Sequence, residues 1–301
     1  TTIGQAVARN PNVITHTGRE APFGYVDWWP TSMWFNHADG PFTAKEVRWA
    51  VSYSINRQQM LDVALEGSGT LTPLPFPRYK PLEPFFEAAA PLLEKYNTME
   101  FNLEKAAALM EGQGYTKDGE GFWVKDGERV ATSISGWQVF TDIGPVIAEQ
   151  LRQGGFEAEF VTPADNGTRI SDGTQKIWLN GHGGSINDPF DTLDMFTSKH
   201  FRPVGEPTSF SSRYQNPEYD AILAQMAVKA SDDPEYMDLY LAALEIYLSD
   251  LIDAPIQQWM HRIPYNQTYW TGWPTQDDPY LNGAFWHLTF MLILQHIQPT
   301  A

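Results

Sequence analysis

The chain has 301 residues and a formal net charge of −17, from 37 acidic and 20 basic side chains. Such an acidic balance argues against nucleic acid as a partner, because the phosphate backbone is itself negatively charged. The sequence contains no cysteine, so a disulfide framework, a thiolate metal site and a cysteine nucleophile are all excluded.

The amino-terminal part of the chain is predicted to hold short elements separated by turns. Residues 5–9 form a short helix, residues 13–15 a strand, residues 20–30 an aromatic-rich loop and residues 33–36 the next strand. The opening Thr1–Gln5 has neither the charged start nor the apolar core of a signal peptide. No apolar run reaches the roughly 18 residues that are needed to span a bilayer.

The segment 41–65 contains the clearest predicted helix. Thr43 and Glu46 have the spacing of a capping box, in which two side chains satisfy the first backbone N–H groups of a helix. An apolar stripe of helical spacing follows, formed by Val47, Val51 and Ile55. The helix is predicted to run without interruption to residue 65, and Gly67 then ends it.

Prolines are so frequent in residues 70–84 that a helix is excluded there. This segment is expected to pack on its own domain as an extended strap, because its aromatic side chains need burial. A linker between domains is the alternative. Farther along, Asn102 begins a helix, residues 121–130 form a hairpin that turns at Asp126-Gly127, and residues 132–137 form a strand.

The second half of the chain alternates helices with strands. Asp142 is predicted to cap a helix, which is followed by strands at residues 156–161 and 175–180. Further helices are expected to begin at the polar residue before a proline, in Asp188-Pro189, Asn216-Pro217 and Asp233-Pro234. This alternation predicts an α/β fold whose sheet is at least partly parallel.

Several segments resemble, in their order, the signature of the family 5 extracytoplasmic solute-binding proteins of bacterial ABC importers. They are Met33–Asn36, Gly40–Phe42, Val47–Ala50, Ser54–Arg57, Ala106–Tyr115 and Ala254–Trp259. The sequence departs from the family pattern at the helix start, where Thr43–Glu46 replaces the usual acidic residue. Ser54–Arg57 differs from the family motif by one residue.

The resemblance implies a periplasmic-binding-protein-like α/β fold with a mixed sheet flanked by helices. Residues 1–253 would form the second lobe, and residues 254–301 the crossover and return segment to a first lobe that is largely missing. The implied protein is a secreted, periplasmic monomer that captures a small-molecule solute and delivers it to the membrane permease. The resemblance implies no cofactor.

The loop after the strand at 175–180 is the predicted place of solute contacts. Its glycines leave backbone N–H groups open to a ligand, and the candidate contacts are Asn180, His182, Gly183, Ser185, Asn187 and Asp188. A plain turn, with Asn187 or Asp188 as helix cap, explains the same residues. The resemblance implies an acidic residue near the middle of this loop in peptide-binding members, and Ser185 takes that position.

Aromatic side chains at strand ends are the second group of candidates, because aromatic faces pack against the C–H surfaces of sugars. They are Trp34, Trp137, Trp178 and Trp259, joined by Asn36 at the end of the first long strand. Each tryptophan taken singly also fits a core position. The favoured solute is therefore an oligosaccharide or glycoside, and a short peptide is the alternative.

Motifs of catalysis and metal binding are missing from the sequence. It has no H-E-x-x-H or H-x-x-x-H zinc spacing, no G-x-S-x-G elbow, no G-x-G-x-x-G and no Walker loop. We therefore expect a binding protein, not an enzyme, and no metal. A secreted glycoside hydrolase is the alternative from another class, since it needs only two facing carboxylates. A structural domain that binds proteins through its acidic face is a third possibility.

Overall fold

A five-stranded mixed sheet forms the centre of the computed structural model, which describes residues 2–300. Its strands, in spatial order, are β10 (Asp253–Gln257), β3 (Thr31–Phe35), β9 (Ile177–Gly181), β7 (Ala131–Ser135) and β8 (Glu157–Val161). The β7 strand pairs in parallel with both β8 and β9, whereas β3 pairs antiparallel with β9 and β10. The expected α/β fold with a mixed sheet flanked by helices is thus confirmed.

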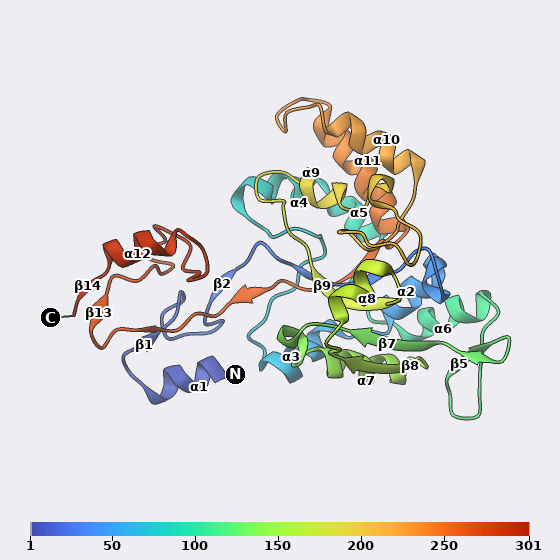
Figure 1. Ribbon diagram of the computed structural model, residues 1–301, viewed down its shortest axis with the longest axis horizontal. Helices are drawn as coiled ribbons and strands as arrows, with labels where there is room; N and C mark the ends of the chain where they lie inside the picture. The colour runs from blue at the N-terminus through green and yellow to red at the C-terminus, as the bar shows by residue number, and fades with distance from the viewer. Residues whose placement is uncertain (1, 301) are drawn as a thin grey trace.

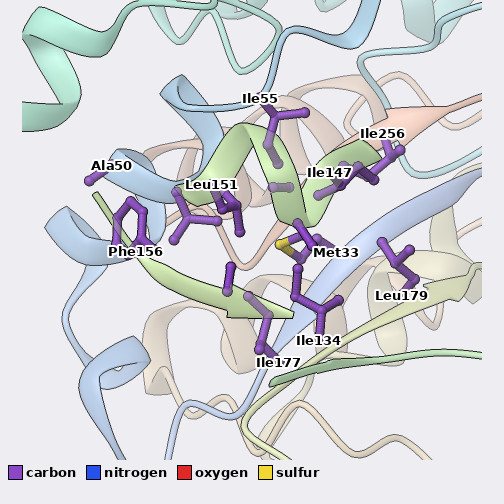
Figure 2. Packing of buried hydrophobic residues seen from close by; sticks show 14 of the residues in the cluster. Met33, Ala50, Ile55, Ile134, Ile147, Leu151, Phe156, Ile177, Leu179 and Ile256 are labelled. Atoms are coloured by element: carbon purple, nitrogen blue, oxygen red, sulfur yellow. The ribbon is translucent and has the colours of Figure 1, made fainter. Parts of the chain in front are cut away.

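Helices cover both faces of this sheet (Figure 1). One face packs against α2 (Lys45–Tyr53), α3 (Arg57–Leu65), α6 (Leu103–Gly112) and α7 (Gly144–Gln153). The other face packs against α4 (Glu83–Ala88), α5 (Ala90–Lys95), α9 (Phe190–Asp194), α10 (Pro217–Met226) and α11 (Tyr236–Ser249). Because successive strand residues point to opposite faces, Met33 and Phe35 enter the first core and Trp34 enters the second. Figure 2 shows Met33 packed with Ile147 and Ile256 in the first core.

The helix predicted for residues 41–65 is wrong in two respects. Two helices, α2 and α3, replace the uninterrupted one, because Asn56 accepts a hydrogen bond from the Gln59 N–H (3.0 Å) and so starts a second helix. The capping box does not form either. Residues 41–43 make a 3₁₀ turn in which the Thr43 hydroxyl donates to the Gly40 carbonyl (3.0 Å). Ala44, which has no side-chain acceptor, takes the cap position of α2.

Other local predictions fare better. Asn102 and Asn216 cap α6 and α10 through side-chain hydrogen bonds. The hairpin between β5 (Trp123–Lys125) and β6 (Glu128–Arg129) turns with positive φ at Asp126 (54°) and Gly127 (85°), as predicted. The cap predicted at Asp142 is wrong, because Ile143 takes the cap position of α7.

The proline-rich strap at residues 70–84 packs on its own domain, as expected. Its Phe76 is buried in the second core with Phe85 and Phe86, which follow it in α4. Thr70 in the strap also forms an isolated antiparallel β-bridge with Gln258, the residue that follows β10. The remaining helix of this body is α8 (Asn166–Asp172), and the short β4 (Thr116–Lys117) extends the hairpin.

The two ends of the chain come together in a small unit beside the main body (Figure 1). It contains α1 (Thr2–Arg9), β1 (Val13–Ile14), β12 (Tyr265–Asn266), β13 (Trp270–Thr271), α12 (Phe290–His296) and β14 (Gln298–Pro299). One antiparallel ribbon, β2 (Tyr25–Val26) with β11 (Met260–His261), joins the unit to the main body. The lobe boundary predicted at residues 253/254 falls inside β10, which pairs with β3 from Asp253 to Gln257 with one register shift after Pro255.

The first core predicts a large stability loss on truncation of α7. Ile147→Ala should lower the free energy of unfolding by about 2–5 kcal/mol, because the side chain is fully buried and its removal leaves a cavity. Urea unfolding followed by circular dichroism measures this loss. The exposed Val63→Ala serves as control and should change stability by less than about 0.5 kcal/mol. Equal effects of the two substitutions would contradict this packing.

Candidate functional site

At one edge of the central sheet, several chain segments that carry tryptophan residues come together. The parallel strands β7 and β9 end there, at Ser135 and Gly181. The antiparallel strand β3 begins there, since Thr31 lies opposite both Gly181 and Gln257. The loops that flank this edge therefore bring together Trp28, Trp29, Trp137, His182, Gly183 and Trp259. We call these residues the tryptophan edge.

Glycines on β9 and its following loop give the neighbouring tryptophans room. A Cβ atom added to Gly181 would lie 2.0 Å from the Trp29 indole, and one added to Gly183 would lie 2.6 Å from the Trp28 ring. Both distances are far below van der Waals contact, so the two indoles lie directly against glycine backbone. Sequence reasoning missed Trp28 and Trp29, although they precede the strand at residues 33–36 and so stand at a strand end like the residues it chose.

The tryptophans of this edge differ in how far they face solvent. Trp29 stacks on Phe140 (centroids 5.6 Å apart, 16° between planes), and Trp259 meets both rings edge-on at 5.7 and 6.0 Å. This cluster packs against the first core. Trp28 and Trp137 are the open ones, with exposed fractions of 37% and 42%. They are the side chains at this edge whose indole faces a solute can reach.

Two of the tryptophans predicted as sugar platforms are core residues. Trp34 and Trp178 are buried in the second core, with ring centroids 6.1 Å apart. Helices cover both faces of the sheet, so a strand residue here is buried whichever way it points. Asn36 lies at the opposite end of β3, where it is buried and its amide donates to the Gly173 carbonyl (2.7 Å). Because these three side chains are buried, a solute cannot contact them.

The loop at residues 182–189 is held by its own hydrogen bonds. Ser185 is buried, and its hydroxyl accepts from the Thr192 N–H (3.0 Å) while the Thr192 hydroxyl accepts from the Ser185 N–H (3.3 Å). Asp188 accepts from the Phe190 N–H and the Tyr236 hydroxyl, both at 2.9 Å. Asn187 is exposed, whereas Asn180 and Gly183 are half-buried. The loop is therefore preorganised, and its exposed positions are Ile186 and Asn187.

A buried carboxylate ties this loop to the sheet and to α11. Asp253 accepts hydrogen bonds from the Ser32 hydroxyl (2.5 Å), from His182 Nε2 and from the Tyr247 hydroxyl. Burial, together with this carboxylate, holds the pKa of Tyr247 well above its ordinary value, so the phenol is a donor at neutral pH. His182 itself is buried and stacks on Trp34 with centroids 5.2 Å apart. His182 was predicted to contact the solute. Its burial instead gives it the role of positioning the loop.

Residues 2–300 contain neither a metal-binding cluster nor a membrane-spanning helix. No group of three or more His, Cys, Asp and Glu side chains there is placed to hold a metal ion. Within the same residues, no helix has the length and apolar character needed to cross a bilayer.

Comparison with known proteins gives a consistent family. The model of the bacterial extracellular solute-binding proteins, family 5 Middle, matches residues 10–203. The glutathione-binding protein GsiB of Escherichia coli (strain K12) is 27% identical over 224 residues, which cover 70% of this chain and 38% of that protein. The chain thus spans well under half the length of this relative.

Solved structures share the fold at lower identity. A periplasmic oligopeptide-binding protein of Thermotoga maritima, solved with bound mannohexaose, superposes with a TM-score of 0.81 at 22% identity, covering 98% of this chain and 56% of that one. The oligopeptide-binding protein AppA of Bacillus subtilis, in complex with a nonapeptide, gives a TM-score of 0.68 at 17% identity, covering 92% and 52%.

The contact between Gly181 and Trp29 predicts a steric effect. Gly181→Ala should displace the Trp29 indole from its stack on Phe140 and lower the free energy of unfolding by about 1–3 kcal/mol. Near-ultraviolet circular dichroism and urea unfolding report the two changes. Gly119→Ala, where an added Cβ meets nothing within 4 Å, is the matched control and should leave both signals unchanged. An unchanged near-ultraviolet spectrum for Gly181→Ala would contradict the proposed contact.

The Asp253 network predicts a larger loss. Asp253→Asn should lower the free energy of unfolding by about 3–5 kcal/mol, because an amide turns its NH₂ group toward one or more of the buried donors. Denaturant unfolding measures the loss. The control Asp232→Asn changes an exposed carboxylate and should stay within about 0.5 kcal/mol of the parent. A loss below about 1 kcal/mol for Asp253→Asn would mean that the carboxylate does not hold these elements together.

Proposed function

The chain belongs to the family 5 bacterial extracellular solute-binding proteins, and from that premise we propose that it acts as the solute-capturing component of an ABC importer. It takes up its solute in the periplasm and delivers it to the membrane permease. The family and the fold of its solved neighbours support a binding role in place of catalysis. The protein is proposed to be a monomer that needs no cofactor.

The capture mechanism rests on two lobes joined by the ribbon of β2 and β11. We propose that the sheet body is one lobe and that the unit built from both chain ends belongs to the other. Because β10 pairs with β3 at both of its ends, we assign it to the sheet body and draw the lobe boundary at the ribbon. A solute that contacts both lobes stabilises the closed arrangement by its higher affinity for it, and the permease then recognises the closed form.

The proposed solute is an oligosaccharide or a glycoside. The observation that carries this choice is the pair of open indoles, Trp28 and Trp137, at the edge where the strand ends converge. Flat, exposed aromatic faces suit the C–H surfaces of sugar rings. Two further points support the same choice. Position 185 holds a serine in place of an acidic residue, and the similar Thermotoga maritima structure contains mannohexaose. A short peptide stays the second candidate, since GsiB and AppA are named for glutathione and oligopeptide binding.

Saturation-transfer difference NMR on the 301-residue chain tests this proposal, because the method detects weak binding to a single lobe. Mannohexaose should bind, whereas glutathione and the tetrapeptide Ser-Thr-Ser-Ala should not. Trp28→Ala and Trp137→Ala should each weaken mannohexaose binding by about tenfold, the equivalent of roughly 1.4 kcal/mol. Trp270→Ala is the matched control, because this tryptophan is 46% exposed and lies in β13 of the terminal unit, away from the main body.

Other outcomes would redirect the proposal. Binding of the peptides without binding of mannohexaose would replace the sugar by a peptide. Hydrolysis of a glycoside, abolished by substitution of one Asp or Glu, would favour the glycoside hydrolase. Equal losses for the control Trp270→Ala and for the two edge variants would remove the tryptophan edge as the binding surface.

A further inference from the structure

A cavity lies beside the ribbon that joins the two units. It is on the face of the sheet that packs against α4 and α5, opposite the Trp29 stack. It has a volume of about 540 Å³, within the roughly 300–1,000 Å³ that is typical of small-molecule pockets. Its walls come from β2, the proline-rich strap, α4, α5 and the residue that follows β10. They include Val26, Leu71, Phe86, Ala90, Leu93 and Gln258.

The lining is chemically uneven in a way that suits an amphiphilic ligand. Carbon surface from Leu71, Phe86 and Leu93 makes up most of the wall, and the Arg78 guanidinium lies over the Phe86 ring at 5.3 Å. Gln258, which is buried, donates from Nε2 to the carbonyls of Asp27 and Trp259, but its Oε1 atom has no hydrogen-bond partner among the described residues. Because this oxygen is shut off from solvent, the polar side chains that a ligand meets at this wall are the exposed Arg78 and Glu87.

The cavity adjoins the tryptophan edge along two separate backbones. Gln258 precedes Trp259 directly, so their Cα atoms are about 3.8 Å apart. Val26 stands two residues before Trp28, which limits their Cα separation to about 7 Å. The backbone at the cavity and the backbone of Trp28 are therefore within the span of one ligand of a few rings.

We propose that this cavity holds an apolar group of the same solute whose sugar ring rests on Trp28, which makes the solute an alkyl or aryl glycoside. The proposal rests on the proposed function and narrows its solute class. The apolar wall removes the aglycone from water, and Arg78 and Glu87 offer polar groups to hydroxyls at the junction of the two parts. Each buried methylene group tightens binding by roughly fourfold.

The test compares hexyl β-D-mannopyranoside with methyl β-D-mannopyranoside on the 301-residue chain, with mannohexaose as a reference for the sugar site. Dissociation constants come from NMR titration. The hexyl glycoside should bind at least tenfold more tightly than the methyl glycoside. Ala90→Phe, which places a ring inside the cavity from an exposed position on α5, should abolish this advantage and leave mannohexaose binding unchanged. Ala221→Phe, at an exposed position on α10, is the matched control and should keep the advantage.

Each contrary result has a distinct meaning. Equal affinities for the hexyl and methyl glycosides in the parent chain would overturn the inference, while bound mannohexaose would leave the proposed function in place. A hexyl advantage that survives Ala90→Phe would overturn the assignment to this cavity. Failure of mannohexaose and both glycosides to bind would overturn the proposed function together with the inference that rests on it.

Discussion

The buried carboxylate of Asp253 is the interaction on which the arrangement of the site depends. It lies at the start of the edge strand β10 and takes donors from β3, from the loop after β9 and from α11. These elements come from distant parts of the chain, and a buried charge is stable only when such donors satisfy it. Its bond to His182 fixes the backbone just before Gly183, where the Trp28 indole lies. The position of the tryptophan edge thus follows from an interaction below it.

Much of the fold could be predicted from local patterns, whereas the failure at residues 54–56 has a tertiary cause. The asparagine caps and the Asp-Gly turn can be predicted from sequence, because each depends only on residues close by in the chain. The break at residues 54–56 cannot be, since the apolar stripe continues across it through Ile55. What favours the break is tertiary. The buried Arg57 donates to the carbonyl of Pro255 in β10 and to those of Ser52 and Ile55.

The site was predictable only in outline. Position at a strand end selected Trp137 and Trp259, which do follow β7 and β10. The same criterion selected Trp34 and Trp178, which the two helical layers bury. A sequence does not reveal which faces of a strand are covered. It also does not reveal that Trp28 and Trp29 depend on Gly183 and Gly181, since those contacts join segments about 150 residues apart. The two tryptophans are visible in the sequence, but the glycines that they contact cannot be identified from it.

The ribbon of β2 and β11 has a mechanical consequence. Its inter-strand hydrogen bonds run perpendicular to the strands, and the ion pair between His261 and Asp27 (2.9 Å) links the two backbones at the same level. Sliding one backbone past the other would break these bonds together, whereas twisting or flexing the ribbon as a whole keeps them intact. In the proposed capture mechanism, relative movement of the two units would therefore be a rotation, in which a solute selects an angle between them without changing the register of the ribbon.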